Sequence, residues 1–244
     1  MAAHGLADSE ALALVMALVC RQDAIDERFF FAHRFGCARM FITLRSLGPM
    51  ATRAGSKSAL LVIDVQVGVV ATAWERDLTI RNIAQAVARA RAARVPVFWI
   101  QHDDADLARD TPEWQWVPEL QPDGDETRIH KHHNSAFEGT TLLPLLDELE
   151  VSHLFIAGAA TNWCIRATTY GALERGFDIT LLKDAHTTRN MELAPDRVVD
   201  ARSMIDDLNV AMRWLSYPGR ANSVIAVAEA DFGDRSAGDS RLAG

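Results

Sequence analysis

Cysteine and lysine are both scarce in this chain of 244 residues, which contains three of each. The cysteines stand at positions 20, 37 and 164, and this small odd number excludes a disulfide framework. We therefore expect a reducing environment and a cytoplasmic location. No stretch approaches the roughly 20 consecutive apolar residues of a membrane span, so no membrane association is predicted.

A basic surface is missing as well. The 33 Asp and Glu residues outnumber the 25 Lys and Arg residues, and the formal net charge is -8. Nucleic-acid binding needs a basic patch, so it is not expected. The segment after the first apolar run reads DVQVGVV (64–70) and contains no Gly-x-Gly-x-x-Gly motif, which excludes a dinucleotide-binding domain.

Residues 1–57 differ from the rest of the chain and are treated as an N-terminal extension. The segment 28–50 is aromatic and basic without a regular period. Two interpretations stay open: an upstream extension of the reading frame that ends before Met50, which we favour, or a helical arm for oligomerisation. The apolar run 11–20 resembles the core of a signal peptide, but acidic residues and no Lys or Arg precede it, which disfavours secretion.

From Ser58 onward, apolar runs alternate with helical patterns. Residues 59–65 (ALLVIDV) form the continuous run typical of a strand buried on both faces, and 78–94 has apolar residues at helical spacing. Further strands are predicted at 95–101, 127–133, 153–158, 177–185 and 223–229, and further helices at 140–150, from about 162, and at 195–209. This alternation predicts an α/β fold: a doubly wound, mostly parallel sheet of about six strands with helices on both faces. The domain would span 58–230, and a polar tail would occupy 231–244.

Three residues suited to chemistry fall at strand ends, where open parallel sheets form their sites. Asp64 closes the first strand, and a carboxylate there is costly unless it caps a loop, binds a ligand or reacts. Lys131 lies next to the end of the third predicted strand in a chain that otherwise uses arginine, which suggests a need for a compact ammonium. The alternative for Lys131 is an ordinary surface lysine.

Cys164 follows GAATNW (158–163), where small residues permit a tight turn and Thr161 or Asn162 can cap a helix. Cys164 would then lie in the first helical turn, where free amides and the helix dipole lower a thiol pKa and can hold an oxyanion. The alternative is a buried, inert cysteine. A thiol, a carboxylate and an ammonium together suit nucleophilic catalysis.

Four segments resemble the isochorismatase-like cysteine hydrolases, which include nicotinamidases and N-carbamoylsarcosine amidases. They occur in the family's order at 59–70, 97–104, 129–142 and 154–188, and the resemblance covers roughly 57–215. The last segment is the most specific, because it joins a strand, Gly-x-x-Thr-x-x-Cys and a helix that ends in Gly before Asp-Ala.

The resemblance implies a role for each strand-end residue. Cys164 would be the nucleophile, Asp64 the general base and acid, and Lys131 the group that positions Asp64 and favours the thiolate. The backbone amides of Ala160 and Cys164 would hold the oxyanion, with a cis peptide between Ala159 and Ala160. The implied activity is hydrolysis of a small amide, lactam or carbamoyl C–N bond through a thioester, without a cofactor and in a homo-oligomer.

The sequence also departs from parts of the family. The metal-binding nicotinamidases carry Asp-x-His after the second strand, but this chain has IQHDDADLARD at 100–110, so no metal is expected. Conceivable ligands in this region are His102, Asp103, His130, His132 and His133. True isochorismatases lack the nucleophilic cysteine, so Cys164 favours cleavage of a C–N bond rather than a vinyl ether.

Aromatic residues near these segments are candidates for the substrate pocket, although each could equally be core packing. The substrate-binding candidates are Trp114, Trp116, Phe137, Trp163 and His186, with Trp74 as a further aromatic residue nearby. The alternative function is a non-catalytic binding module on the same fold, which the presence of all three polar residues disfavours.

Overall fold

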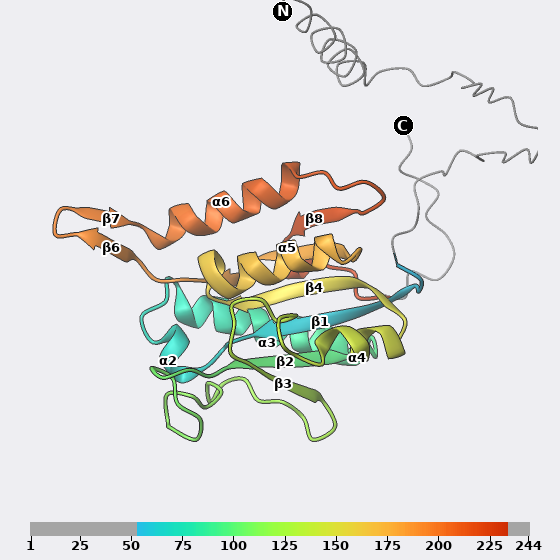
Figure 1. Ribbon diagram of the computed structural model, residues 1–244, viewed down its shortest axis with the longest axis horizontal. Helices are drawn as coiled ribbons and strands as arrows, with labels where there is room; N and C mark the ends of the chain where they lie inside the picture. The colour runs from blue at the N-terminus through green and yellow to red at the C-terminus, as the bar shows by residue number, and fades with distance from the viewer. Residues whose placement is uncertain (1–52, 234–244) are drawn as a thin grey trace, which may run out of the picture. The chain divides into compact units, whose positions relative to one another are not determined.

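The computed structural model describes residues 53–233 (Figure 1). The N-terminal extension up to residue 52, with Cys20 and Cys37, lies outside the described residues, as does the tail from residue 234.

A single sheet of six parallel strands forms the centre of the fold, in the order β3-β2-β1-β4-β5-β8. The strands are β1 (Lys57–Ile63), β2 (Val97–His102), β3 (Thr127–Lys131), β4 (Val151–Ala159), β5 (Asp178–Thr187) and β8 (Asn222–Ile225). The chain builds outward from β1 to β3 and then returns to pair β4 with β1, so the winding reverses between these two strands. This arrangement confirms the predicted doubly wound sheet.

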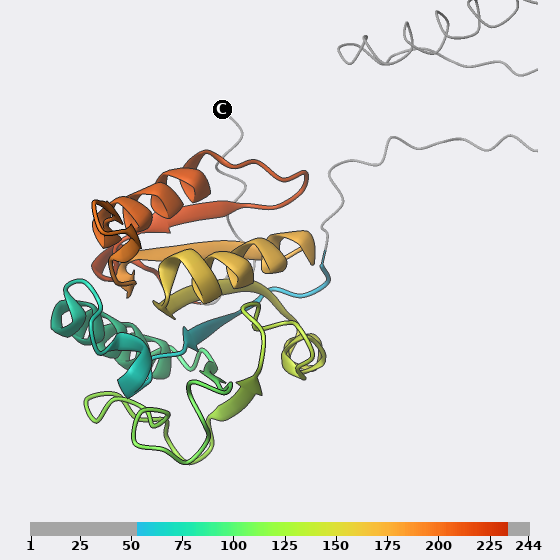
Figure 2. The ribbon, with the colours of Figure 1, turned by 60° about the vertical axis from the view of Figure 1, so that its left-hand side comes forward.

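Helices cover both faces of the sheet, as the alternating pattern predicts. Helix α3 (Arg76–Ala92) packs on one face, and α4 (Leu142–Glu148), α5 (Arg166–Glu174) and α6 (Ala201–Trp214) pack on the other. The turned view of Figure 2 separates α3, in teal, from α5, in gold, and α6, in orange. A short helix, α2 (Val67–Val70), follows β1 and was not anticipated from the sequence.

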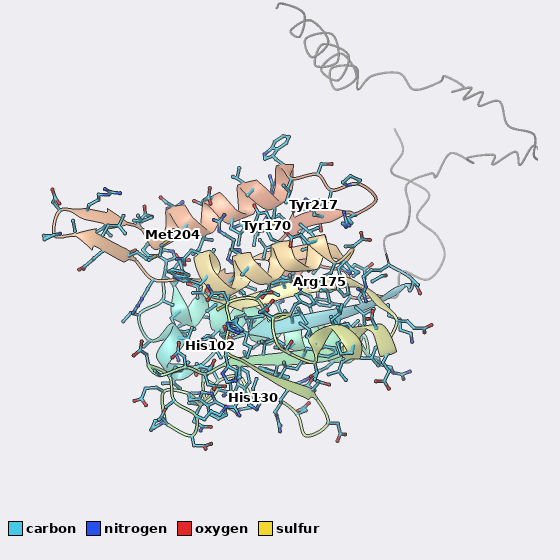
Figure 3. The ribbon with its side chains drawn as sticks, in the orientation of Figure 1. His102, His130, Tyr170, Arg175, Met204 and Tyr217 are labelled. Carbon is cyan, nitrogen blue, oxygen red and sulfur yellow. The ribbon has the colours of Figure 1, made fainter. Side chains whose placement is uncertain are left out.

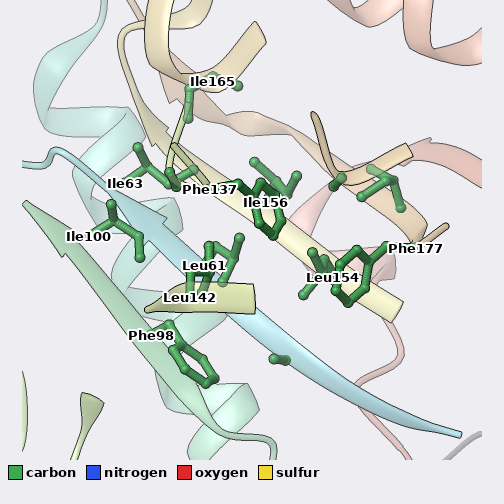
Figure 4. Close-up of a cluster of buried hydrophobic side chains, with 14 of the residues drawn as sticks. Leu61, Ile63, Phe98, Ile100, Phe137, Leu142, Leu154, Ile156, Ile165 and Phe177 are labelled. Carbon is green, nitrogen blue, oxygen red and sulfur yellow. The ribbon is translucent and has the colours of Figure 1, made fainter. Parts of the chain in front are cut away.

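The core consists of two apolar clusters, one on each face of the sheet. Successive side chains of β1 alternate between them: Leu60 and Val62 face α3, while Leu61 and Ile63 belong to the opposite cluster. Figure 4 shows the second cluster, where Leu142 of α4 packs among strand residues. Burial on both faces explains why β1 is a continuous apolar run.

The region after β5 differs from the prediction of a helix over 195–209. Residues 191–199 form a hairpin of β6 (Met191–Ala194) and β7 (Arg197–Val199), and it projects beyond the sheet at the left of Figure 1. Pro195 and Asp196 make the turn, as both residue types favour. Helix α6 begins only at Ala201, because the Asp200 side chain caps it by accepting from the Ser203 amide at 2.8 Å.

The last described residues complete the packing of the sheet. Strand β8 ends at Ile225, earlier than the predicted 229, and residues 227–229 form a single 3₁₀ turn. Phe232 is buried and its ring lies 4.3 Å from that of Phe155, centroid to centroid. Within residues 53–233, no helix combines the length and apolar character that crossing a membrane requires.

Candidate active site

Three segments that are distant in the sequence end at the same edge of the sheet. Asp64 follows β1 directly, Lys131 is the last residue of β3, and Cys164 lies in the turn after β4. Because β1 and β4 are the strands between which the winding reverses, this is the crevice where doubly wound sheets form their sites.

Gly158 allows the close approach of β4 to β1 beside this crevice. A Cβ atom at position 158 would lie 2.0 Å from the carbonyl oxygen of Ile63, and the residue has a φ of 126°. Only glycine fits both conditions. The strand that carries the cysteine can therefore lie next to the strand that carries the aspartate.

Lys131 joins the other two groups. Its Nζ lies 2.7 Å from Asp64 Oδ2 and donates to Cys164 Sγ at 3.2 Å. The His133 carbonyl accepts a further hydrogen bond at 3.2 Å. The side chain is 1% exposed, so this is a buried ammonium rather than the surface lysine of the alternative interpretation. Burial opposes its charge, but the contacts with the Asp64 carboxylate and with Cys164 outweigh burial and raise the pKa of Lys131.

Asp64 is an equally buried carboxylate whose oxygens can accept further hydrogen bonds. Its side chain is 1% exposed, and apart from the ion pair to Lys131 neither oxygen has a well-directed hydrogen bond within residues 53–233. Burial raises the pKa of Asp64, and the nearby Lys131 charge only partly offsets this effect. Asp64 also has a φ of 51°, a left-handed conformation that is uncommon outside glycine. The Cys164 thiol is close enough to Asp64 to act on its pKa, so the carboxylate is placed to accept the thiol proton.

Cys164 lies in a single π-helical turn, Thr161–Ile165, that leads into α5. The prediction of a Thr161 or Asn162 cap is wrong: Ala160 precedes the turn, and no side chain caps it. The Thr161 hydroxyl instead bonds the His186 ring at 2.9 Å, and the Asn162 amide oxygen accepts from Thr188 at 2.6 Å. These side chains tie the turn to the segment that follows β5.

The expected lowering of the thiol pKa is also wrong. Burial, together with the negative charge of Asp64, raises the pKa of Cys164 to about 12, although Lys131 acts in the opposite direction. The reason is that the thiol is only 8% exposed and shares its ammonium with a carboxylate. At neutral pH the resting thiol therefore keeps its proton.

The peptide bond between Ala159 and Ala160 is cis, which confirms the expectation from the resemblance. Beyond it, the amides of Trp163 and Ile165 both donate to the Ala160 carbonyl, at 3.0 and 3.2 Å. The backbone from Ala160 to Cys164 is thereby fixed around the thiol.

His102 is a further neighbour of the ammonium that sequence reasoning did not assign to this role. It ends β2 directly beside Lys131 in the strand register, and its Nδ1 lies 3.3 Å from Lys131 Nζ. Its Nε2 lies 3.0 Å from Asp104 Oδ2. Gln66 holds the backbone of His102 by accepting from its amide and donating to its carbonyl, both at 2.9 Å. Figure 3 labels His102 at this end of the sheet.

A cavity of about 950 Å³ opens above the thiol. Asp64, Ala160 and Cys164 line it together with His102 and Trp163. The Trp163 side chain is 51% exposed, so its ring is available to a ligand. The β6 residues Met191 and Glu192 and the preceding residues 188–190 also line the cavity.

The other predicted pocket residues lie elsewhere. Phe137 is buried in the core, where its ring stacks on Phe177, and Trp116 is buried against Trp99. Trp114 stacks on His130, and His186 is 2% exposed between Thr161 and Asn209. None of the four lines the cavity described above. Trp74, also outside it, lies near Thr188, whose carbonyl accepts from the Trp74 amide.

The conceivable metal ligands have other partners. Asp103 pairs with Arg109 at 2.8 Å and with His132 at 3.1 Å. His102 contacts Lys131 and Asp104, as described, and His130 stacks on Trp114. In the part of the chain that the structure describes, no three His, Cys, Asp or Glu side chains are arranged to hold a metal ion.

Some residues of the site carried a signal that the sequence reasoning passed over. His102 stands at the carboxyl end of a predicted strand, as Asp64 and Lys131 do. The hairpin residues Met191 and Glu192 carried no such signal, because their segment lies beyond the motifs. Asn134, whose Oδ1 is 3.9 Å from the Cys164 sulfur, lies three residues after Lys131.

Fold and geometry together define a doubly wound α/β protein with a buried thiol, carboxylate and ammonium at its switch point. The model of the Isochorismatase domain matches residues 58–204, more than half of the chain. The chain belongs to the isochorismatase family.

Two streptothricin hydrolases of Streptomyces noursei are similar to this chain, with 34% identity over 154 residues and 35% over 144 residues. The alignments cover 60% and 57% of this chain, but only 61% and 52% of the two relatives, so the chain matches about half to three fifths of their length. Among solved structures, an isochorismatase from Pseudomonas putida KT2440 is 25% identical, with a TM-score of 0.63, and the match covers 72% of this chain and 91% of that one.

Proposed function

We propose that this protein hydrolyses the C–N bond of a small amide, lactam or carbamoyl compound through a thioester on Cys164. The observation that carries this proposal is the position of Lys131, 2.7 Å from the Asp64 carboxylate and 3.2 Å from the Cys164 sulfur. A buried ammonium in contact with both a thiol and a carboxylate can stabilise negative charge on either group. The cavity above these groups is large enough for a small molecule.

The first step transfers a proton and forms a bond. Asp64 accepts the thiol proton, and the Cys164 sulfur attacks the carbonyl carbon of the bound amide. A thiol pKa of about 12 makes a free thiolate rare, so proton transfer accompanies attack. The raised pKa of Asp64 brings donor and acceptor closer together in proton affinity. The negative charge then moves from the carboxylate to the substrate while Lys131 stays in contact with the site.

The second step expels the amine. The tetrahedral oxyanion accepts hydrogen bonds from the Ala160 and Cys164 amides, each worth roughly 3–4 kcal/mol in comparable sites. Asp64 returns its proton to the nitrogen of the leaving group as the C–N bond breaks. The acyl group remains on Cys164 as a thioester.

The third step restores the enzyme. Asp64, again ionised beside Lys131, takes a proton from a water molecule that attacks the thioester. The C–S bond of the thioester breaks, Asp64 passes its proton to the Cys164 sulfur, and the carboxylic acid product leaves. Each residue ends in its starting state, and no cofactor is consumed.

The substrate class is supported by the relatives as well as by the site. The two Streptomyces noursei proteins are named streptothricin hydrolases. A ureidoacrylate amidohydrolase and a maleamate amidohydrolase also match this chain, with 27% identity each. Small molecules that contain an amide bond are therefore the first compounds to test.

The test is a screen of small amides, lactams and carbamoyl compounds for released ammonia or amine. Cys164→Ala should abolish turnover, and Lys131→Met should reduce it by roughly 100-fold or more, because the charge on the site is no longer balanced. Lys183→Met is the matched control, since Lys183 pairs with Glu229 at 3.8 Å outside the site. Turnover that survives Cys164→Ala would exclude the thioester mechanism.

A further inference from the structure

The cavity above the thiol carries far more negative than positive charge. Its lining contains one arginine, Arg189, and five carboxylates: Asp64, Asp104, Asp106, Glu113 and Glu192. Asp64 is balanced by Lys131, and Asp104 uses its oxygens to bind His102 and the amides of residues 106 and 107. These two carboxylates therefore have protein partners.

The remaining three carboxylates do not. The side chains of Asp106, Glu113 and Glu192 form no hydrogen bond or ion pair with other residues of the described range 53–233. Against the single guanidinium of Arg189, they leave an excess of negative charge around one concave space. Like charges around a cleft repel one another, and a cleft focuses their field on whatever enters it. A positively charged ligand would relieve this repulsion.

The carboxylates do not form a metal site. Within residues 53–233, no three His, Cys, Asp or Glu side chains converge closely enough to coordinate an ion. Asp106 and Glu113 stand on the segment after β2, whereas Glu192 belongs to β6. An organic cation, which needs no short coordination bonds, fits such a spread arrangement better than a metal ion.

Two further features of the cavity point to a ligand with N–H groups and positive charge. The Asp64 carboxylate is buried, lines the cavity and, apart from its ion pair with Lys131, has no well-directed hydrogen bond in the described part of the chain. Trp163, next to the nucleophile, presents a half-exposed indole ring to the same space. The face of an indole attracts ammonium and guanidinium groups.

We infer that the substrates are amides that also carry an organic cation, an ammonium or a guanidinium group. The carbonyl lies at Cys164, and the cationic end lies towards Asp106 and Glu113, which stand on the segment after β2, whereas Arg189 stands on the segment before β6. This inference rests on the proposed amide hydrolysis, but it concerns binding as well as turnover.

The experiment uses the full-length protein and compares two amides of equal length. In 6-aminohexanamide the end away from the amide is an ammonium, and in 6-hydroxyhexanamide it is a neutral hydroxyl. Binding is measured by calorimetry in Cys164→Ala, which cannot turn either compound over, and kcat/KM is measured in the unsubstituted protein. We expect the ammonium compound to be favoured about tenfold in both, because several weak charge contacts act together. The preference should shrink as salt is added.

Substitutions of the carboxylates test where the cationic end of the substrate binds. Asp106→Asn combined with Glu113→Gln should reduce the preference to about twofold or less. Asp110→Asn is the matched control, because Asp110 lies on the same segment outside the cavity lining. It should leave the preference unchanged.

The outcomes separate this inference from the proposed function. Equal affinity and equal kcat/KM for the two amides, with turnover that depends on Cys164, would overturn the inference and leave the hydrolase proposal intact. A preference in binding without Cys164-dependent turnover of any amide would support a cation site and refute the hydrolase proposal. A preference that Asp110→Asn abolishes as strongly as the double variant would refute the assigned position of the cation.

Discussion

The ammonium of Lys131 lies 3.3 Å from Nδ1 of His102, and it must be the donor in this contact because an ammonium has no lone pair. Nδ1 of His102 is therefore the unprotonated nitrogen, and Nε2 carries the hydrogen that Asp104 accepts at 3.0 Å. The hydrogen bond from His102 lowers the pKa of Asp104. A chain of three side chains, Asp104, His102 and Lys131, thus holds the ammonium in contact with Asp64 and Cys164.

Removing the imidazole should impair turnover more than binding. We expect His102→Ala to lower kcat by roughly tenfold, because Lys131 loses one of its fixed acceptors, with a smaller change in KM. Steady-state kinetics on the best amide from the screen measure both constants. His130→Ala is the control, since His130 stacks on Trp114 and has no contact with Lys131. An unchanged kcat in His102→Ala would show that the imidazole does not position the ammonium.

Neutralising Asp64 should separate thiol reactivity from turnover. The negative charge of Asp64 contributes to the high pKa of Cys164, second only to burial. Asp64→Asn should therefore lower this pKa and speed alkylation of Cys164 by iodoacetamide about tenfold near neutral pH, while hydrolysis is lost because the base is gone. Mass spectrometry of the labelled peptide measures the rate.

The unsubstituted protein gives the reference for this experiment. Its alkylation rate near neutral pH should be lower than that of a free thiol and should continue to rise well above the ordinary cysteine pKa. Rapid labelling near neutral pH would contradict the assigned charge state. Equal labelling rates in the two proteins would mean that Asp64 does not oppose thiolate formation.

His186 should make the fold sensitive to mild acid. Burial lowers the pKa of His186 to about 4, so the folded state keeps the ring neutral while the unfolded state binds a proton below about pH 6.5. The stabilisation is complete above that pH and is lost as the pH falls towards 4. Between about pH 7 and pH 5, the free energy of unfolding should fall by about 2 kcal/mol from this group.

Urea unfolding at the two pH values measures this loss. His186→Gln removes the titration and keeps an amide that can reach Thr161 or Asn209. Its stability should depend less on pH over the same interval, by about the same 2 kcal/mol. An identical pH dependence in the two proteins would assign the acid sensitivity to other groups.

Gly158 should tolerate no side chain. In Gly158→Ala the new Cβ would collide with the Ile63 carbonyl, and the alanine would need a φ of 126°. We expect a loss of about 3 kcal/mol or more in the free energy of unfolding, with low soluble yield. Gly124→Ala is the control, because no atom outside its own neighbourhood lies within 4 Å of the added Cβ. A similar Tm for both variants would contradict the close packing of β1 and β4.

The regular part of the fold was predictable because strands buried on both faces leave a strong sequence signal. The run at 59–65 and the arginine-bearing helix at 78–94 correspond to β1 and α3 with small shifts at their ends. The three strand-end residues were found by the same logic, since parallel strands bring their carboxyl ends to one edge. Their roles came from the resemblance and stay predictions.

What could not be predicted depends on contacts between distant segments. The thiol pKa follows from the burial of Cys164 and from its position beside Asp64. The sequence pattern that predicts the start of a helix indicates neither the burial nor the neighbouring carboxylate. The ring of Phe137 faces the core rather than the cavity, and only the packing of α5 on the sheet decides between these two directions. The hairpin was not predicted because its turn residues, Pro195 and Asp196, also fit the first positions of the helix expected over 195–209.

The hairpin β6–β7 supplies Met191 and Glu192 to the cavity and yet stands apart from both apolar clusters. Its sequence can drift without disturbing the sheet that holds the sulfur, the acid and the ammonium, since loops outside a core tolerate change. The nine residues 191–199 can therefore change the shape and charge of the cavity while the arrangement of Asp64, Lys131 and Cys164 stays constant.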